Sequence, residues 1–80
     1  MTQNEIMKHI KRKKDAAPFG IGTRVLHLQM IKFYKELEGL SGAEFCQGAD
    51  LERSYGAEFS KMQAIAPELV AAGLDTNLID

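Results

Sequence analysis

The sequence predicts an all-α fold, in which four or five short helices form a compact bundle. Apolar residues recur at the three- and four-residue spacing of a helix face, and no useful length alternates with the period of two that marks a strand. Two Ser/Thr-x-x-Glu sequences mark helix starts, at Thr2 and at Ser41. The 80 residues suffice for one domain. We expect residues 1–17 to form a basic N-terminal helix, 23–74 the helical core and 75–80 a tail.

The first predicted helix begins at a capping box made by Thr2 and Glu5. Its apolar face is short and is followed by a run of four cations, Lys11, Arg12, Lys13 and Lys14. Such a run suits the negative C-terminal end of a helix dipole, where it can simply be solvated. It also suits contact with the phosphates of a nucleic acid. Both interpretations remain open at this point. The following Pro18 and two glycines predict a linker.

The stretch 23–40 predicts a central helix, because it is the longest run without a helix breaker. Its large apolar residues fall at steps of four, three, four and three, which places them on one face: Leu26, Met30, Phe33, Leu37 and Leu40. Thr23 is the expected N-cap, and Gly39 is the expected left-handed residue after the last turn. We expect Phe33, with Phe59 from a later helix, to be largely buried in one core.

A second capping box, Ser41 with Glu44, opens a short helix that we expect to end near Gly48. Asp50 is the expected cap of the next helix. That helix has an apolar stripe at spacings of four, four, three and four: Leu51, Tyr55, Phe59, Met62 and Ala66. Gly56 inside it favours close approach of another backbone. Pro67 fits the first turn of a separate last helix, which we expect to end at Gly73.

Composition favours an ordinary globular protein, with 45% hydrophobic and 26% charged residues. No apolar run approaches the roughly 18 residues of a membrane span, and the N-terminus lacks the apolar core of a secretory signal. A single cysteine suits a reducing, cytoplasmic location. Charge is unevenly distributed: residues 1–35 hold eight Lys and Arg against two acids, and residues 36–80 hold two against nine. This asymmetry favours an anionic partner, or association of complementary faces.

No pattern predicts an enzyme, a cofactor or a metal site. His9 and His27 lie on different predicted helices with no cysteine or carboxylate at ligand spacing, and a metal site needs three or four converging ligands. Cys46 follows Phe45 on an apolar face and has no basic neighbour in sequence. We therefore interpret it as a small buried residue rather than a nucleophile.

The helix pair between residues 41 and 62 resembles the helix-turn-helix of small DNA-binding domains. Its apolar and small residues fall where that family has them: Phe45, Cys46, Ala49, Leu51 and Phe59. Two positions depart from the family pattern. Asp50 stands where the turn usually has glycine, and Gly56 stands where a branched apolar residue is usual, so the angle between the helices is open.

The resemblance implies a small DNA-binding protein, such as a transcriptional regulator, with double-stranded DNA as its partner. In this interpretation Arg53, Ser54 and Tyr55 begin a recognition helix and face the bases. Phosphates would be held by Lys61 and by the basic run Lys11, Arg12, Lys13 and Lys14. Glu52 and Glu58 oppose this role, because carboxylates repel phosphates. The alternative is a protein–protein interaction or oligomerisation module, in which the chain binds itself or another protein without nucleic acid.

Overall fold

The computed structural model describes residues 1–80 and contains helices and connecting turns, with no strand. Four α-helices and one short 3-10 helix follow one another along the chain: α1 Gln3–Ala16, α2 Gly22–Lys32, α3 Gly42–Ala49, α4 Tyr55–Ala71 and η1 Thr76–Leu78. The predicted all-α fold is confirmed. The Cα radius of gyration of 11.7 Å is that of a compact chain of this length, for which about 12 Å is expected.

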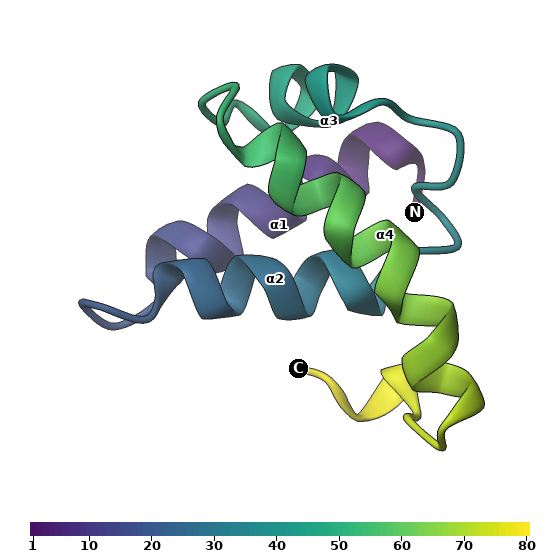
Figure 1. Ribbon diagram of the computed structural model, residues 1–80. Coiled ribbons are helices and arrows are strands. Elements are labelled where there is room, and N and C mark those ends of the chain that lie inside the picture. The colour runs from purple at the N-terminus through teal and green to yellow at the C-terminus, as the bar shows by residue number, and fades with distance from the viewer.

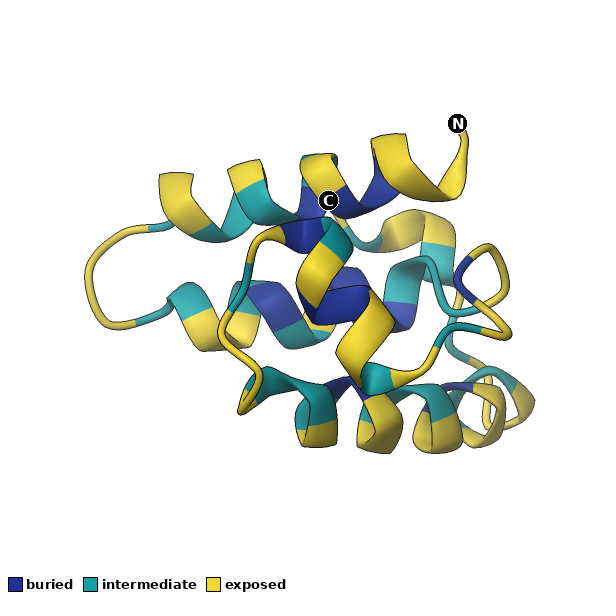
Figure 2. Ribbon diagram, turned by 90° about the horizontal axis from the view of Figure 1, so that it is seen from above, coloured by how far each residue is buried: buried dark blue, intermediate teal, exposed yellow.

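The helices are arranged as two packed pairs (Figure 1). α1 and α2 run antiparallel to each other, and α4 crosses them at a steep angle. α3 packs against α1 and against the beginning of α4. Figure 2 shows that the buried positions of the helices face the space they share, while their outer faces are exposed. The core is therefore enclosed by all four helices.

Ten buried residues form that core: Ile6, Met7, Ile10, Leu26, Met30, Leu37, Phe45, Cys46, Ala49 and Phe59. The rings of Phe45 and Phe59 lie stacked at its centre, with centroids 4.3 Å apart and planes 9° from parallel. Phe59 is buried as predicted. Phe33 was expected to be largely buried in the same core; it is partly buried and packs against the cluster. An edge-on contact with His9, at 5.8 Å between centroids, covers its ring.

Both predicted capping boxes are present. The Glu5 N–H donates to the Thr2 hydroxyl at 3.2 Å, and the Thr2 N–H donates to the Glu5 carboxylate at 2.8 Å. Ser41 and Glu44 repeat the arrangement at the start of α3, with distances of 3.1 and 2.8 Å. The hydrogen bonds to these carboxylates lower the pKa of Glu5 and of Glu44. The starts of α1 and α3 are thus determined locally.

The predicted central helix 23–40 is too long. α2 begins at Gly22 and ends at Lys32, Thr23 is not its N-cap, and residues 33–39 form hydrogen-bonded turns. Other helices supply partners for two carbonyl groups of this segment: Gln63 donates to Tyr34 and Gln3 donates to Glu36, each at 3.0 Å. The turns keep contacts between residues three and four apart, so their sequence pattern resembles that of a helix. Gly39 does adopt the expected left-handed conformation, with φ of 94°.

Two further boundaries differ from the prediction. Asp50 does not cap the following helix; it ends α3, which extends past the expected stop at Gly48 to Ala49. Pro67 does not open a separate helix, because α4 continues through it to Ala71. A proline inside a helix removes one hydrogen bond, but a break there would expose the fully buried Ala66. Gly73, with φ of 115°, then ends the helix as predicted.

The C-terminal residues fold back on α2. The Gln29 amide donates to the carbonyl oxygen of Asp80, and the Lys32 ammonium donates to that of Ile79. These bonds hold residues 76–80 beside the second half of α2. None of the helices combines the length and the apolar character needed to cross a membrane.

Candidate nucleic-acid interface

The α3–α4 pair is held by direct backbone contact between two glycines. A Cβ atom added at Gly42, the first residue of α3, would lie 2.6 Å from the carbonyl oxygen of Gly56 and 2.8 Å from its Cα. A Cβ atom at Gly56 would lie 3.2 Å from the carbonyl carbon of Gly42. The close approach expected of Gly56 is therefore present. Its departure from the helix-turn-helix pattern coincides with this close approach, because even a Cβ atom at Gly56 would lie closer to the Gly42 backbone than ordinary van der Waals contact.

The turn between these helices also explains the second departure. Asp50 adopts the left-handed conformation, with φ of 55° and ψ of 49°, which glycine usually supplies. Aspartate is among the few other residues that adopt it readily. The next residue, Leu51, donates its N–H to the carbonyl of Cys46 at 2.9 Å and packs against the core. The chain then enters α4 with Arg53 and Ser54 exposed.

The outer face of α4 is lined by small and polar side chains. Ala57, Ser60, Lys61 and Ala64 are exposed at helical spacing, opposite the buried Phe59. Of these four residues, only Lys61 was predicted from the sequence as a DNA-contacting residue. The sequence feature that could have identified this face is the recurrence of alanine and serine between the apolar positions of the α4 stripe. Short side chains on this face allow another molecule to approach the helix backbone closely.

The four cations at the end of α1 point in different directions. Lys14 reaches α4, and its Nζ lies 5.4 Å from the ring centroid of Tyr55. Lys11 is paired with Asp15 at 3.2 Å, on an exposed part of the helix. Arg12 is exposed, and Lys13 borders a cavity beside α2 and the C-terminal tail. Of the basic run, Lys14 is thus the member that contacts the start of α4.

Tyr55 lies at the junction of these elements. Its side chain packs against the hydrophobic core and is partly buried, so the ring supports α4 from inside. Lys14 above the ring is in range for a cation–π interaction, which favours a fixed position for the ammonium group. The beginning of α4 and the end of α1 are therefore brought together, which the sequence could not show.

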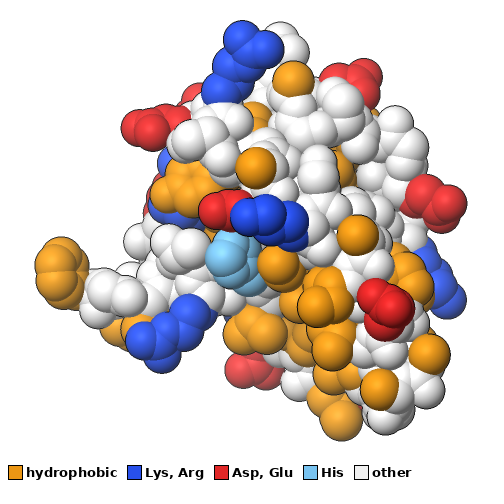
Figure 3. Space-filling model, viewed as in Figure 1, with side chains coloured by type: hydrophobic (Ala, Val, Ile, Leu, Met, Phe, Trp, Pro, Cys, Tyr) orange, Lys and Arg blue, Asp and Glu red, His pale blue; other side chains and the backbone are white.

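Acidic groups lie beside the same helix. The Lys61 ammonium is 4.0 Å from the carboxylate of Glu58, and the lysine side chain is 74% exposed. Glu52 is exposed in the turn before α4. Figure 3 shows charges of both signs on the face that α4 presents, with apolar side chains gathered over its C-terminal half. The positive charge near α4 is local rather than a continuous patch on this face.

Comparison with known families gives a match over most of the chain. A family model described as an HTH-like domain matches residues 2–72. The chain belongs to this HTH-like domain family. No curated protein and no solved structure matches it at a significant level. The resemblance inferred for residues 41–62 is confirmed, and the match extends to α1 and α2, so the HTH-like domain includes the helices that carry the basic run.

The HTH-like domain places its other reactive groups apart. Cys46 is buried, and burial raises the pKa of its thiol, so it stays protonated at neutral pH. His9 contacts Phe33, whereas His27 lies on α2. No three His, Cys, Asp or Glu side chains converge closely enough to hold a metal ion.

Proposed function

We propose that this HTH-like domain binds double-stranded DNA, with the outer face of α4 in the major groove. The observation that carries the proposal is the contact of Lys14 with Tyr55, which brings a cation from α1 to the start of α4 in a chain of this family. A helix that reads bases needs phosphate contacts beside it to set its position. Lys14 is located to supply one of them.

The proposed roles follow from exposure. Arg53 and Ser54 are exposed at the start of α4, where recognition helices contact base edges. Arginine pairs with guanine through two hydrogen bonds, and serine bonds to several bases. Ala57 and Ala64 leave room for the helix to enter the groove. Lys11, Arg12 and Lys61 provide further phosphate contacts, and Tyr55 holds Lys14 in place.

The test is a titration of fluorescent duplexes with the 80-residue chain at several salt concentrations. Affinity should fall steeply with salt, because each neutralised phosphate releases counterions, with a slope of about −0.9 per contact. Lys14→Gln should weaken all duplexes alike and reduce that slope by about 1. Arg53→Ala should cost about 1–3 kcal/mol on a preferred site and little on other sequences.

Two variants serve as controls. Lys8→Gln removes an exposed cation from the same helix and should leave binding nearly unchanged. Glu52→Gln removes a carboxylate from the turn and should strengthen binding to every duplex. Absence of duplex binding at low salt and high micromolar protein would overturn the proposal.

The alternative function, self-association or binding of another protein, is supported by exposed apolar side chains. Leu28 is 48% exposed on α2, and Ile65 is 42% exposed on the C-terminal half of α4. Sedimentation at low and high salt distinguishes the forces involved. An oligomer held by the oppositely charged halves of the chain should dissociate at 1 M salt, where screening shortens to about 3 Å. An apolar dimer should persist there and be lost in Ile65→Glu.

A further inference from the structure

Phe19 lies at the tip of the connection between α1 and α2 with its whole side chain in solvent. It is 106% exposed, the highest value among the large apolar residues of the chain. Gly20 follows it with a left-handed φ of 89°, so the backbone turns at this point. Figure 1 shows that the connection projects beyond the two helices that it joins. An aromatic ring presented in this way adds nothing to the core, but it can bury a large apolar area in an interface.

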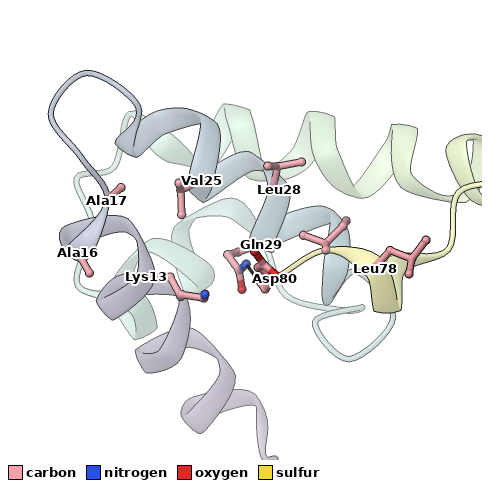
Figure 4. Close-up of a pocket in the computed structure, with 9 residues that line it drawn as sticks. Lys13, Ala16, Ala17, Val25, Leu28, Gln29, Leu78 and Asp80 are labelled. Atoms are coloured by element: carbon pink, nitrogen blue, oxygen red, sulfur yellow. Dashed lines mark hydrogen bonds between the residues drawn. The ribbon is translucent and has the colours of Figure 1, made fainter.

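A surface cavity of about 540 Å³ lies between the end of α1, the middle of α2 and the C-terminal tail (Figure 4). Six of its nine lining residues are apolar: Ala16, Ala17, Val25, Leu28, Leu78 and Ile79. Leu28 and Leu78 are 48% and 81% exposed, so the cavity is an open apolar surface. An apolar cavity of about 150 Å³ already accommodates a benzene ring, so this one has room for a phenylalanine side chain.

The charged groups of the cavity wall fit an aromatic ring with a cation beside it. Lys13 lines the wall, and a lysine ammonium is attracted to the face of an aromatic ring, as Lys14 is to Tyr55. Asp80 also lines the wall, and its side chain forms no salt bridge within the chain. In the 80-residue chain Asp80 carries the main-chain carboxylate as well, so this end of the cavity is negative.

Arg24 supplies a cation close to Phe19. It is exposed in the first turn of α2 and forms no salt bridge within the chain. It precedes Leu28 by four residues, so the two side chains share one face of the helix. Helical side chains lean toward the N-terminal end of their helix, which directs Arg24 toward the Phe19 connection. Phe19 and Arg24 therefore match the apolar and the acidic parts of the cavity.

A second copy of this chain is the partner that fits both the projecting ring and the cavity at once. Val25 and Leu28 of the cavity wall lie about 5 and 9 Å along α2 from its start, at 1.5 Å per residue. The chain thus presents Phe19 before the start of α2 and the cavity further along the same helix. When two copies meet with their α2 helices antiparallel, one two-fold axis places each Phe19 at the cavity of the other copy.

We propose that the chain forms a two-fold homodimer in which Phe19 of each copy enters the apolar cavity of the other. The ring lies against the apolar wall with the Lys13 ammonium at its face, and Arg24 lies near Asp80 of the other copy. Small interfaces are typical of weak association, so the dimer should form at about 0.1–1 mM protein and be absent at low micromolar concentration. No residue of α4 lines the cavity, so the dimer does not rest on the proposed binding of DNA.

Sedimentation equilibrium between about 10 µM and 1 mM protein measures this association. Phe19→Ser deletes the ring, and Ala16→Trp fills the cavity from an exposed position at the end of α1. Each variant should dimerise about 100-fold more weakly than the parent, because both contacts are lost and burial of each phenyl ring is worth about tenfold. Circular dichroism verifies that the variants fold.

A mixture of the two variants tests whether the rings are exchanged between copies. The Phe19→Ser copy keeps its cavity and the Ala16→Trp copy keeps its ring, so their heterodimer retains one of the two contacts. The mixture should therefore associate about tenfold more tightly than either variant alone. In an isotope-filtered NMR experiment on the parent, the Phe19 ring should contact the methyl groups of Val25 and Leu28 in the other copy.

Matched controls separate this interface from other surfaces. Ile65→Ser removes exposed apolar surface from α4, outside the cavity, and should leave the dimer unchanged. Arg24→Glu should weaken the dimer several-fold, because it places a carboxylate near Asp80 of the other copy. Lys8→Glu makes the same change of charge at an exposed position of α1 that does not line the cavity, and it should have little effect.

Three results would each overturn the proposal. The first is a chain that stays monomeric up to about 1 mM, including one that instead uses Phe19 to bind vesicles of anionic lipid. The second is a Phe19→Ser protein that dimerises as tightly as the parent. The third is a mixture of Phe19→Ser and Ala16→Trp that associates no more tightly than the separate variants.

Discussion

The α1–α2 and α3–α4 pairs are joined by connections of equal length yet are held together differently. Residues 17–21 join the first pair and residues 50–54 the second, five in each case. The first connection carries a fully exposed Phe19 at its tip, and its two helices contribute long side chains such as Ile10 and Met30 to the buried core. In the second pair the backbones touch at Gly42 and Gly56.

This difference indicates which geometry can adjust. Flexible side chains between α1 and α2 can repack around a change, as cores often do when volume is conserved. The α3–α4 crossing has no side chain to move at its closest point. We infer that the angle of the helix-turn-helix pair is set by backbone contact, while the first pair has more freedom.

The largest expected effect comes from removing the aromatic centre of the second pair. Phe59→Ala deletes a side chain that is 1% exposed and stacked on Phe45, so it should cost about 3–5 kcal/mol of unfolding free energy. Phe19→Ala, in the first connection, should cost almost nothing. Urea denaturation measures both. A Phe59→Ala protein with an unchanged midpoint would contradict the assignment of this stack as the core.

A matched glycine pair tests the backbone contact directly. Gly42 and Gly22 are each the first residue of a helix, but a Cβ atom at Gly22 would meet only Lys14, at 3.5 Å or more. Gly42→Ala should destabilise by about 1–3 kcal/mol through overpacking. Gly22→Ala should stabilise by up to about 1 kcal/mol through reduced chain entropy. Equal effects of the two substitutions would remove the distinction between the helix pairs.

A smaller effect is expected at the left-handed residue of the second connection. Asp50→Ala should cost about 1 kcal/mol, because alanine lacks the local hydrogen bonding that lets aspartate adopt positive φ. Asp50→Gly should stay within about 0.5 kcal/mol of the parent, since glycine adopts this conformation freely. Chemical denaturation distinguishes them. If both variants lose the same stability, the carboxylate rather than the backbone conformation is what matters.

The smallest expected effect is a pH dependence of stability that arises in the α1–α2 pair. Burial lowers the pKa of His9 on α1 from its ordinary value of 6.5, and Arg12, Lys13 and Lys32 lower it further. His9 therefore binds a proton more readily in the unfolded chain than in the folded chain. The free energy of unfolding should fall as pH drops through about 6.5. His9→Gln should flatten this dependence between pH 7.5 and 5.5, as measured by thermal unfolding. If the His9→Gln protein keeps the full pH dependence of stability, another titrating group causes that dependence.

In a second, lower pH range the stability of both helix pairs should change. The capping carboxylates Glu5 and Glu44 have a lowered pKa, so the stability they provide is present above about 4.5 and is lost as pH falls further. Measurements above pH 5.5 keep this loss separate from the titration of His9.

Local chemistry made several features predictable from sequence. The all-α class follows from apolar spacing, and the starts of α1 and α3 follow from side-chain-to-backbone bonds within four residues. The helix-turn-helix pair was recognisable because its apolar and small residues recur at characteristic positions. Gly39 and Gly73 were identifiable as left-handed residues because they follow apolar helical runs.

Only the tertiary structure decided the remaining features, because each depends on partners far apart in the chain. α2 ends at Lys32, and the carbonyl groups of Tyr34 and Glu36 in the turns beyond it accept hydrogen bonds from Gln63 and Gln3 of other helices. Lys14 meets Tyr55, and Gln29 meets Asp80, across distances in sequence that no periodicity encodes. Spacing within a helix determines which residues share a face, but the face of another helix that they meet is determined by packing alone.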